Sequence, residues 1–155
     1  MHYRLYRPDD FAQLYAIEET CFPLPFRFGK RYMRQLVDSP NGATWIAEDG
    51  DIMVGFAIVE FSADDDESSA YIQTIEVAPA HRRRGIGAEL LQLMENSAQA
   101  AGAPAISLHV DAQNSSAIRL YGANGYRNEG RLEHYYAHGR AGDIYVKSLR
   151  SDPQT

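Results

Sequence analysis

The sequence predicts a single α/β domain in which paired strands alternate with helices. The chain has 155 residues, the usual size of one domain. Apolar segments at 43–47 and 52–61 flank the turn sequence Glu48–Asp51, a pattern typical of an antiparallel strand pair. Apolar residues from Ile86 to Ala98 instead recur at helical spacing. Together these patterns predict a mixed fold over residues 1–150, followed by a loose tail at 151–155.

The N-terminal elements follow from their breaker residues. Residues 3–6 predict a strand, and Pro8-Asp9-Asp10 then suits the first turn of a helix that runs to about Thr20. Two prolines place the apolar segment Phe22–Phe26 in a loop. A second helix is expected at 30–37, where it ends before a turn sequence rich in Ser, Pro, Asn and Gly.

The later elements alternate between strands and helices. A strand at 71–77 follows the acidic stretch 64–67, which we interpret as a solvated hairpin loop and not as a metal site. Helix 85–101 ends before Gly102, and a strand follows at 105–110. A helix at 115–123 and a terminal strand pair at 127–135 and 143–149 complete the prediction.

Composition excludes several classes of function. The net charge of −6 should repel nucleic acid and anionic membranes. The apolar runs are too short for a membrane span or a signal peptide, so a cytoplasmic location is expected. The lone Cys21 is interpreted as a core residue, and a monomer or a homodimer is compatible with the sequence. No metal is expected.

An arginine-glycine loop after strand 71–77 is the clearest chemical signal. Arg82-Arg83-Arg84-Gly85-Ile86-Gly87-Ala88 leads directly into the predicted helix. The first N–H groups of a helix lack intrahelical acceptors and bind anions, while glycine allows a close approach of the backbone. The P-loop and the dinucleotide fingerprint both fail, because no Gly-Lys-Ser/Thr and no third glycine follow.

The spacing Arg82-x-x-Gly85-x-Gly87 resembles the coenzyme A signature of the GCN5-related N-acetyltransferase (GNAT) family. A second block, Leu108-His109-Val110 with Asn114 to Tyr121 and Gly125-Tyr126, is similar to the later strand-helix-turn of that family. The resemblance implies six or seven strands in a mostly antiparallel sheet, about four helices, and two splayed parallel central strands at 71–77 and 105–110.

The same resemblance implies an acetyl-CoA site. Backbone groups of Ile75 and Val77 would bind the pantetheine arm, and the loop from Arg82 to Ala88 would bind the pyrophosphate. Asn114 matches a coenzyme-contacting asparagine of the family, although it could equally cap the following helix. Tyr121 matches the tyrosine that protonates the leaving thiolate, although it could instead pack between helix and sheet.

The acceptor side resembles N-terminal acetyltransferases. Bacterial ribosomal-protein alanine acetyltransferases usually have a glutamate at the position of His109, whereas the eukaryotic subunits that act on methionine-starting peptides share Tyr71 and His109. In that group the pair relays a proton, and histidine suits the task because its reference pKa is about 6.5. Glu76, His81 and a water relay through Tyr71 remain alternatives for the base. The acceptor-contacting residues implied by the resemblance are Phe22, Pro23, Leu24, Tyr135 and Tyr136.

The sequence therefore predicts an acetyl-CoA-dependent N-acetyltransferase that acts on the α-amino group of a peptide or protein. An alternative acceptor is a small amine, such as a polyamine, an amino acid or an antibiotic. A third hypothesis is a non-catalytic acetyl-CoA-binding module.

Overall fold

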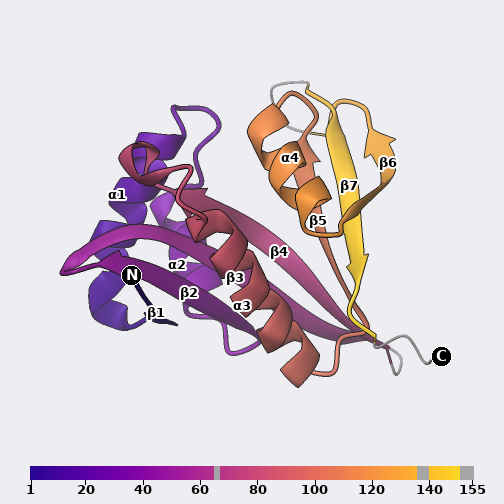
Figure 1. The fold of residues 1–155 in the computed structure, drawn as a ribbon, viewed down its shortest axis with the longest axis horizontal. Helices are drawn as coiled ribbons and strands as arrows, with labels where there is room; N and C mark the ends of the chain where they lie inside the picture. Colours follow the sequence, from indigo (N-terminus) through magenta and orange to yellow (C-terminus); the bar gives the residue numbers. More distant parts are fainter. Residues whose placement is uncertain (65–66, 136–139, 151–155) are drawn as a thin grey trace. The chain divides into compact units, whose positions relative to one another are not determined.

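The computed structural model describes residues 1–64, 67–135 and 140–150 (Figure 1). These residues form two compact units. Unit 1 comprises residues 1–60 and 72–94, and unit 2 comprises residues 61–71 and 95–155. Each unit is described by itself below.

In the described part of the chain, seven strands form a mixed sheet, with the order β1-β2-β3-β4-β5-β7-β6. Four α-helices and two short 3₁₀ turns complete the fold, so the predicted class is confirmed. The strands are β1 (His2–Leu5), β2 (Gly42–Asp49), β3 (Ile52–Asp64), β4 (Glu67–Val77), β5 (Ala105–Asp111), β6 (Arg127–Leu132) and β7 (Gly142–Ser148). The helices are α1 (Phe11–Cys21), α2 (Lys30–Val37), α3 (Ile86–Ala100) and α4 (Ser115–Ala123).

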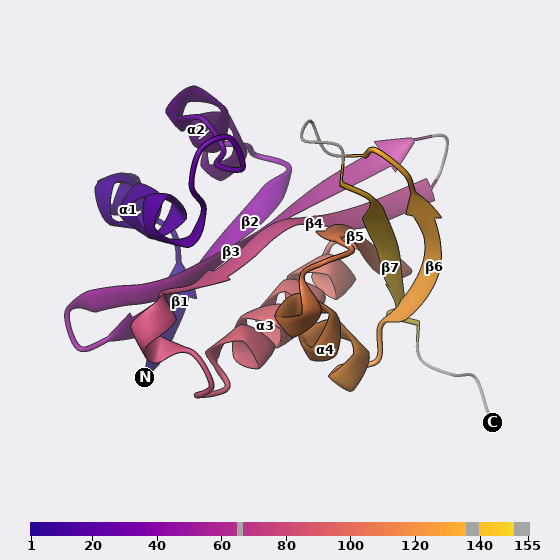
Figure 2. The same ribbon diagram turned by 90° about the horizontal axis from the view of Figure 1, so that it is seen from above.

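Unit 1 is built on the antiparallel strands β1, β2 and β3. Helices α1 and α2 cover one face of these strands, and the first part of α3 lies against the other (Figure 2). The buried stripe of α1 repeats every three or four residues, as expected for an amphipathic helix. The core under α1 and α2 consists of Phe11, Leu14, Tyr15, Ile17, Met33, Leu36, Ile46, Met53, Phe56 and Ile58.

Unit 2 contains β5, β7 and β6, which pair antiparallel. Helix α4 lies beside β5 and β7 (Figure 1). Strand β5 alternates between fully and partly buried side chains, which is the period of a strand with one packed face. This alternation buries Leu108 and Val110 and leaves the His109 ring partly exposed on the opposite face.

Several boundaries differ from the sequence prediction for identifiable reasons. Residues Pro8–Asp10 form a 3₁₀ turn and not the start of α1, because the Asp10 carboxylate accepts the Arg7 N–H at 2.7 Å and two Arg4 bonds at 2.8 Å. The predicted acidic loop 64–67 is shorter, since β3 reaches Asp64 and β4 starts at Glu67. The ladder is supported beyond the expected boundary by a 2.6 Å hydrogen bond between Ser62 and Ser69.

Strand β6 ends at Leu132, before the predicted end at residue 135. His134 has a left-handed backbone with φ 54°, which turns the chain out of the strand before Tyr135. Tyr136, the other tyrosine expected near the acceptor, and the tail 151–155 lie outside the described residues.

Candidate active site

Three of the predicted site residues, each with an aromatic side chain, lie together in unit 2. The Tyr71 hydroxyl, from β4, is 2.8 Å from Nδ1 of His109, on β5. The ring of Tyr135 stacks on the other side of His109, with ring centroids 4.5 Å apart and an interplanar angle of 7°. The imidazole is therefore held by a hydrogen bond at one nitrogen and by a stacked ring across its face.

The electrostatic setting of His109 favours its neutral form. Partial burial lowers the pKa of the imidazole below its ordinary value. A neutral imidazole has one protonated nitrogen and one acceptor nitrogen. Because Nδ1 is bonded to Tyr71, either the Tyr71 hydroxyl donates to Nδ1, or Nδ1–H donates to Tyr71 and leaves the lone pair on Nε2. The two arrangements differ in which ring nitrogen carries the proton, and the role of His109 as a base stays a prediction.

Gly142, the first residue of β7, makes room for the stacked Tyr135 ring. A Cβ atom at position 142 would lie 2.8 Å from Cδ2 and 3.1 Å from Cγ of Tyr135. Such contacts are shorter than real Cβ contacts, so any larger residue would displace the ring. Sequence reasoning missed Gly142, because nothing in the local sequence indicates which side chain faces this glycine.

We expect Gly142→Ala to raise the pKa of His109 toward 6.5, since displacing Tyr135 would admit water to the imidazole and reduce its desolvation. An NMR titration of the His109 ring measures this directly. Tyr135→Ala should produce a similar rise, and the double variant should rise no further than Tyr135→Ala alone, because the two changes act through one contact.

Gly122→Ala is the matched control for this titration. Gly122 lies in α4, and an added Cβ would meet nothing within 4 Å. The control should leave the His109 titration unchanged and slightly stabilise the helix. Additive effects of Gly142→Ala and Tyr135→Ala would show that Gly142 acts by another route.

Helix α4 carries two more of the predicted site residues. Asn114 caps the helix, with its side-chain oxygen accepting the Ala117 N–H at 3.2 Å, as one of the two interpretations expected. Tyr121 is 7% exposed, and its ring lies 5.7 Å from Tyr126 and 6.3 Å from Tyr145. Its packing role is therefore present, while its catalytic role stays a prediction.

A buried polar network anchors the tyrosine next to Tyr121. Tyr126 donates its hydroxyl hydrogen to Oε2 of Glu95 at 2.8 Å, and Lys147 donates to Oε1 at 2.9 Å. Burial and the Glu95 carboxylate raise the pKa of Tyr126. Tyr126 is therefore held neutral as a structural hydrogen-bond donor. This structural role of Tyr126 differs from the proton donation predicted for Tyr121, although the two rings are neighbours.

The arginine-glycine loop of unit 1 has the backbone geometry of an anion site. Arg83 and Gly85 adopt left-handed conformations, with φ 66° and 80°. Helix α3 begins at Ile86, and the Glu89 N–H bonds to the Gly85 carbonyl at 3.1 Å, so the N–H groups of the preceding turn have no acceptor within the helix. Ile86 is 2% exposed and anchors the turn in the core. Pyrophosphate binding at this turn stays a prediction.

The arginines of the loop also make internal contacts. Arg82 donates from Nε to the Val77 carbonyl at 3.0 Å and contacts the Cys21 sulfur at 3.5 Å. Arg84 bonds to Asp49 at 3.3 Å and to Nδ1 of His81 at 2.9 Å. The Val77 carbonyl thus accepts a donor from Arg82, and the predicted contacts of the Ile75 and Val77 backbone with pantetheine stay predictions.

The predicted acceptor loop lies between α1 and α2 in unit 1. Its prolines produce a turn closed by the Phe26 N–H and the Pro23 carbonyl at 2.8 Å. Leu24 is 75% exposed, and Phe22 is half-buried. An apolar side chain so exposed is available for contact with another molecule.

Glu76, an alternative base at the sequence level, is not placed as one. Its side chain is 3% exposed and faces α1, where Glu18 is 1% exposed. Burial, followed by the hydrogen bond and charge of Glu18, raises the pKa of Glu76 far above its usual range. Sequence reasoning missed Glu18, although its position in the stripe Phe11, Leu14, Tyr15 was a usable signal.

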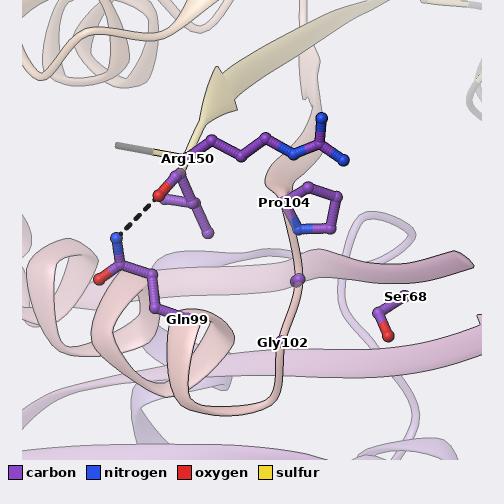
Figure 3. Close-up of a pocket in the computed structure, with 7 residues that line it drawn as sticks. Ser68, Gln99, Gly102, Pro104 and Arg150 are labelled. Carbon is purple, nitrogen blue, oxygen red and sulfur yellow. Dashed lines mark hydrogen bonds between the residues drawn. The ribbon is translucent and has the colours of Figure 1, made fainter. Parts of the chain in front are cut away.

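A cavity of about 550 Å³ lies in unit 2, lined by Ser68, Gln99, Gly102, Ala103, Pro104, Leu149 and Arg150 (Figure 3). Gln99 donates across it to the Leu149 carbonyl at 3.0 Å. None of the predicted site residues lines it, so its chemistry does not add to the candidate site.

The described residues contain neither a membrane-spanning helix nor a metal-binding cluster. None of the helices there combines the length and the apolar character that crossing a bilayer requires. No cluster of three or more His, Cys, Asp or Glu side chains has the arrangement of a metal site in the described ranges.

The mixed sheet and the arginine-glycine turn before α3 agree with the expected class of protein, an N-acetyltransferase. The chain belongs to the acetyltransferase (GNAT) family, whose model matches residues 11–126. The expected family is thereby confirmed.

The chain is similar to acetyltransferases whose names indicate different acceptors. N-alpha-acetyltransferase 50 of Danio rerio is 28% identical, over 93% of this chain and 86% of its own length. Histone acetyltransferase MCC1 of Arabidopsis thaliana is 26% identical over 88% of this chain, which spans only 64% of the MCC1 length. The structure of the ribosomal-protein-S18-alanine N-acetyltransferase from Escherichia coli has a TM-score of 0.83 at 21% identity, covering 99% of this chain and 98% of that one. The last comparison shows the fold alone.

Proposed function

We propose that this protein acetylates the α-amino group of a peptide or protein N-terminus, with acetyl-CoA as the donor. The hydrogen bond between Tyr71 and His109, with Tyr135 stacked on the imidazole, carries the proposal. In the proposed mechanism this pair would act as the base that takes a proton from the attacking amine. The similarity to N-alpha-acetyltransferase 50 supports the same acceptor class.

The chemistry of the acceptor agrees with a mild base. An α-amino group has a pKa near 7.7 to 8.0, so part of it is unprotonated at pH 7, whereas a lysine near 10.4 costs about 3 to 4 kcal/mol more to deprotonate. A histidine relay can remove one proton from such an amine. Phe22, Pro23 and Leu24 would contact the first side chain of the peptide, and Tyr135 and Tyr136 its backbone.

On the donor side, each predicted residue would have a separate role. Bound acetyl-CoA supplies a thioester whose carbonyl carbon an unprotonated amine attacks. The N–H groups from Arg83 to Ala88 would bind the pyrophosphate, assisted by Arg82. Tyr121 would donate its phenolic proton to the departing thiolate. With a phenol pKa near 10 and a thiol pKa of about 8 to 9, this transfer is uphill by only about one to two pKa units, so a correctly placed phenol can assist the departure as negative charge develops on the sulfur. Asn114 would contact the coenzyme through its amide hydrogens.

The acceptor class is tested with a panel of amines. We expect acetyl transfer to peptides with a free N-terminus, detected by mass spectrometry, and none to the same peptides with a blocked N-terminus and an internal lysine. Peptides varied at their first two residues identify the preferred side chain.

Two results would contradict the proposed function. Turnover of a polyamine or an antibiotic without any acetylated peptide would replace the proposed acceptor with a small amine. Binding of acetyl-CoA without transfer to any acceptor would instead indicate a non-catalytic binding module.

A further inference from the structure

Two carboxyl groups meet inside unit 1, where apolar side chains would be expected. Glu18 continues the buried stripe of α1, four residues after Leu14. Glu76 lies on the buried face of β4, two residues from Thr74 and four from Ile72. Both are almost fully buried, at 1% and 3% exposure. Two ionised carboxylates at such positions would strongly destabilise the fold.

In each carboxyl group one oxygen accepts a hydrogen bond and the other has no donor in the described part of the chain. Oε2 of Glu18 accepts the Phe28 N–H at 2.9 Å, and Oε2 of Glu76 accepts the Thr74 hydroxyl hydrogen at 2.9 Å. Oε1 of both residues is buried without a donor among the described residues. Glu18 and Glu76 interact directly, so the two unsatisfied oxygens belong to neighbouring groups. Two acceptors can satisfy each other only if a proton lies between them.

The surroundings do not neutralise two negative charges. Arg82 exerts a favourable charge effect on Glu76, but its guanidinium is exposed and engaged with the Val77 carbonyl and the Cys21 sulfur. The Cys21 thiol lies at the end of α1, and burial raises its pKa, so it stays uncharged. A proton on the pair is the remaining way to remove one charge.

The pair is connected to the predicted acceptor loop through a backbone atom. The loop 22–29 is tied to α1 at Phe28, whose carbonyl accepts the Tyr15 hydroxyl hydrogen at 2.7 Å and whose N–H donates to Glu18. Arg27 closes the same loop by donating to the Phe22 carbonyl at 3.0 Å. Glu18 therefore links β4, through Glu76, to the loop that carries Phe22, Pro23 and Leu24.

We propose that Glu18 and Glu76 share one proton and that this neutralised pair positions the loop 22–29 for acceptor binding. The role toward the acceptor rests on the proposed function, whereas the shared proton and the hold on the loop do not. The carboxyl hydrogen of one residue is donated to Oε1 of the other, and the Glu18 oxygen on the far side stays available for Phe28. These glutamates are positioning residues, because neither contacts a substrate.

The shared proton is tested by the pH dependence of unfolding in the parent and in Glu76→Gln. In the unfolded chain a glutamate releases its proton near pH 4.3, whereas the buried pair retains one to a much higher pH. The unfolded state then binds fewer protons, so stability falls as pH rises above about 5. A glutamine amide donates to Glu18 at every pH. We therefore expect Glu76→Gln to be at least as stable as the parent at pH 8 and to lose less stability between pH 5 and pH 9.

The hold on the loop is tested by tryptic cleavage of the folded protein after Arg27. Glu18→Ala should raise this rate about tenfold, because the Phe28 N–H loses its acceptor. Glu18→Gln keeps an acceptor oxygen and should stay within about twofold of the parent. The matched control is Glu19→Gln. Glu19 is the adjacent carboxylate and is half exposed; its side chain lies 3.8 Å from Arg27, and its backbone carbonyl, which the substitution leaves in place, accepts from Arg27 at 3.4 Å. Its cleavage rate should equal that of the parent.

The role toward the acceptor is tested by measuring the Michaelis constants (KM) for the peptide and for acetyl-CoA separately. Glu18→Ala should raise the KM for the peptide about tenfold and leave the KM for acetyl-CoA within about twofold. Destabilisation by Glu76→Gln, or a pH dependence identical to the parent, would overturn the shared proton. Faster cleavage in Glu18→Ala with an unchanged peptide KM would overturn the acceptor role alone. Failure of the proposed function would leave the unfolding and cleavage results intact.

Discussion

Replacing Tyr121 by phenylalanine is expected to lower kcat about 100- to 1000-fold while the protein stays folded, since a general acid contributes about 10² to 10⁴ in rate. The ring contacts with Tyr126 and Tyr145 do not need the hydroxyl, so packing is preserved. Single-turnover kinetics with saturating acetyl-CoA and peptide measures the chemical step. The affinity for acetyl-CoA, measured separately, should change little.

Tyr126→Phe is the matched control, because it removes a hydroxyl from the neighbouring ring. That hydroxyl satisfies the buried Glu95, so its loss should lower the free energy of unfolding by about 1.5 to 3 kcal/mol. The chemical step of the folded fraction should be retained. The catalytic assignment of Tyr121 is wrong if both variants keep the parental kcat, or if Tyr121→Phe lowers stability instead of rate.

His109→Ala is expected to lower kcat about 100-fold through loss of the base. In the parent, the rate should fall as the pH drops through the pKa of His109, which burial places below the ordinary 6.5 of histidine. Protonated imidazole cannot accept a proton, so the decline lies on the acid side. The pH profile of His109→Ala should lack this decline on the acid side. A pH profile of kcat from 5 to 9 measures both effects.

Tyr71→Phe distinguishes the two routes for the proton. If the Tyr71 hydroxyl takes the proton from the amine and passes it to Nδ1, removing the hydroxyl should cost as much as removing His109. If Nε2 is the base and Nδ1–H donates to Tyr71, the cost should be about tenfold or less, because the hydroxyl only orients the ring. Parental rates in both variants would mean that the base lies elsewhere.

The sequence predicted the fold and the donor motif because both depend on local patterns. Helices 30–37 and 115–123 have the predicted bounds, since periodicity, breakers and an Asn cap mark them in the chain itself. The joint role of Tyr71 and His109 was inferred from family resemblance, and in the structure the two side chains lie within hydrogen-bond distance. Their catalytic roles stay predictions.

The contacts that sequence could not predict depend on residues far apart in the chain. Gly142 matters only because Tyr135 turns back onto it, through the left-handed backbone at His134. Glu18 and Glu76 are ordinary charged residues until two elements bury them together. The spacing of the arginine-glycine loop likewise gave no sign that the Arg82 guanidinium is engaged with β4. Such pairings arise from tertiary structure, not from local propensity.

The loop 22–29 is held through backbone atoms, so its side chains can change during evolution. Helix α1 holds the loop through hydrogen bonds to the backbone N–H and carbonyl of Phe28. Arg27 donates a further hydrogen bond to the Phe22 carbonyl. Main-chain atoms are the same in every residue, so these attachments persist when side chains change. Leu24, which is mostly exposed, contributes little to the core. Substitutions at its position can therefore accumulate without unfolding the protein, and under the proposed function they would change the preferred acceptor at low cost in stability.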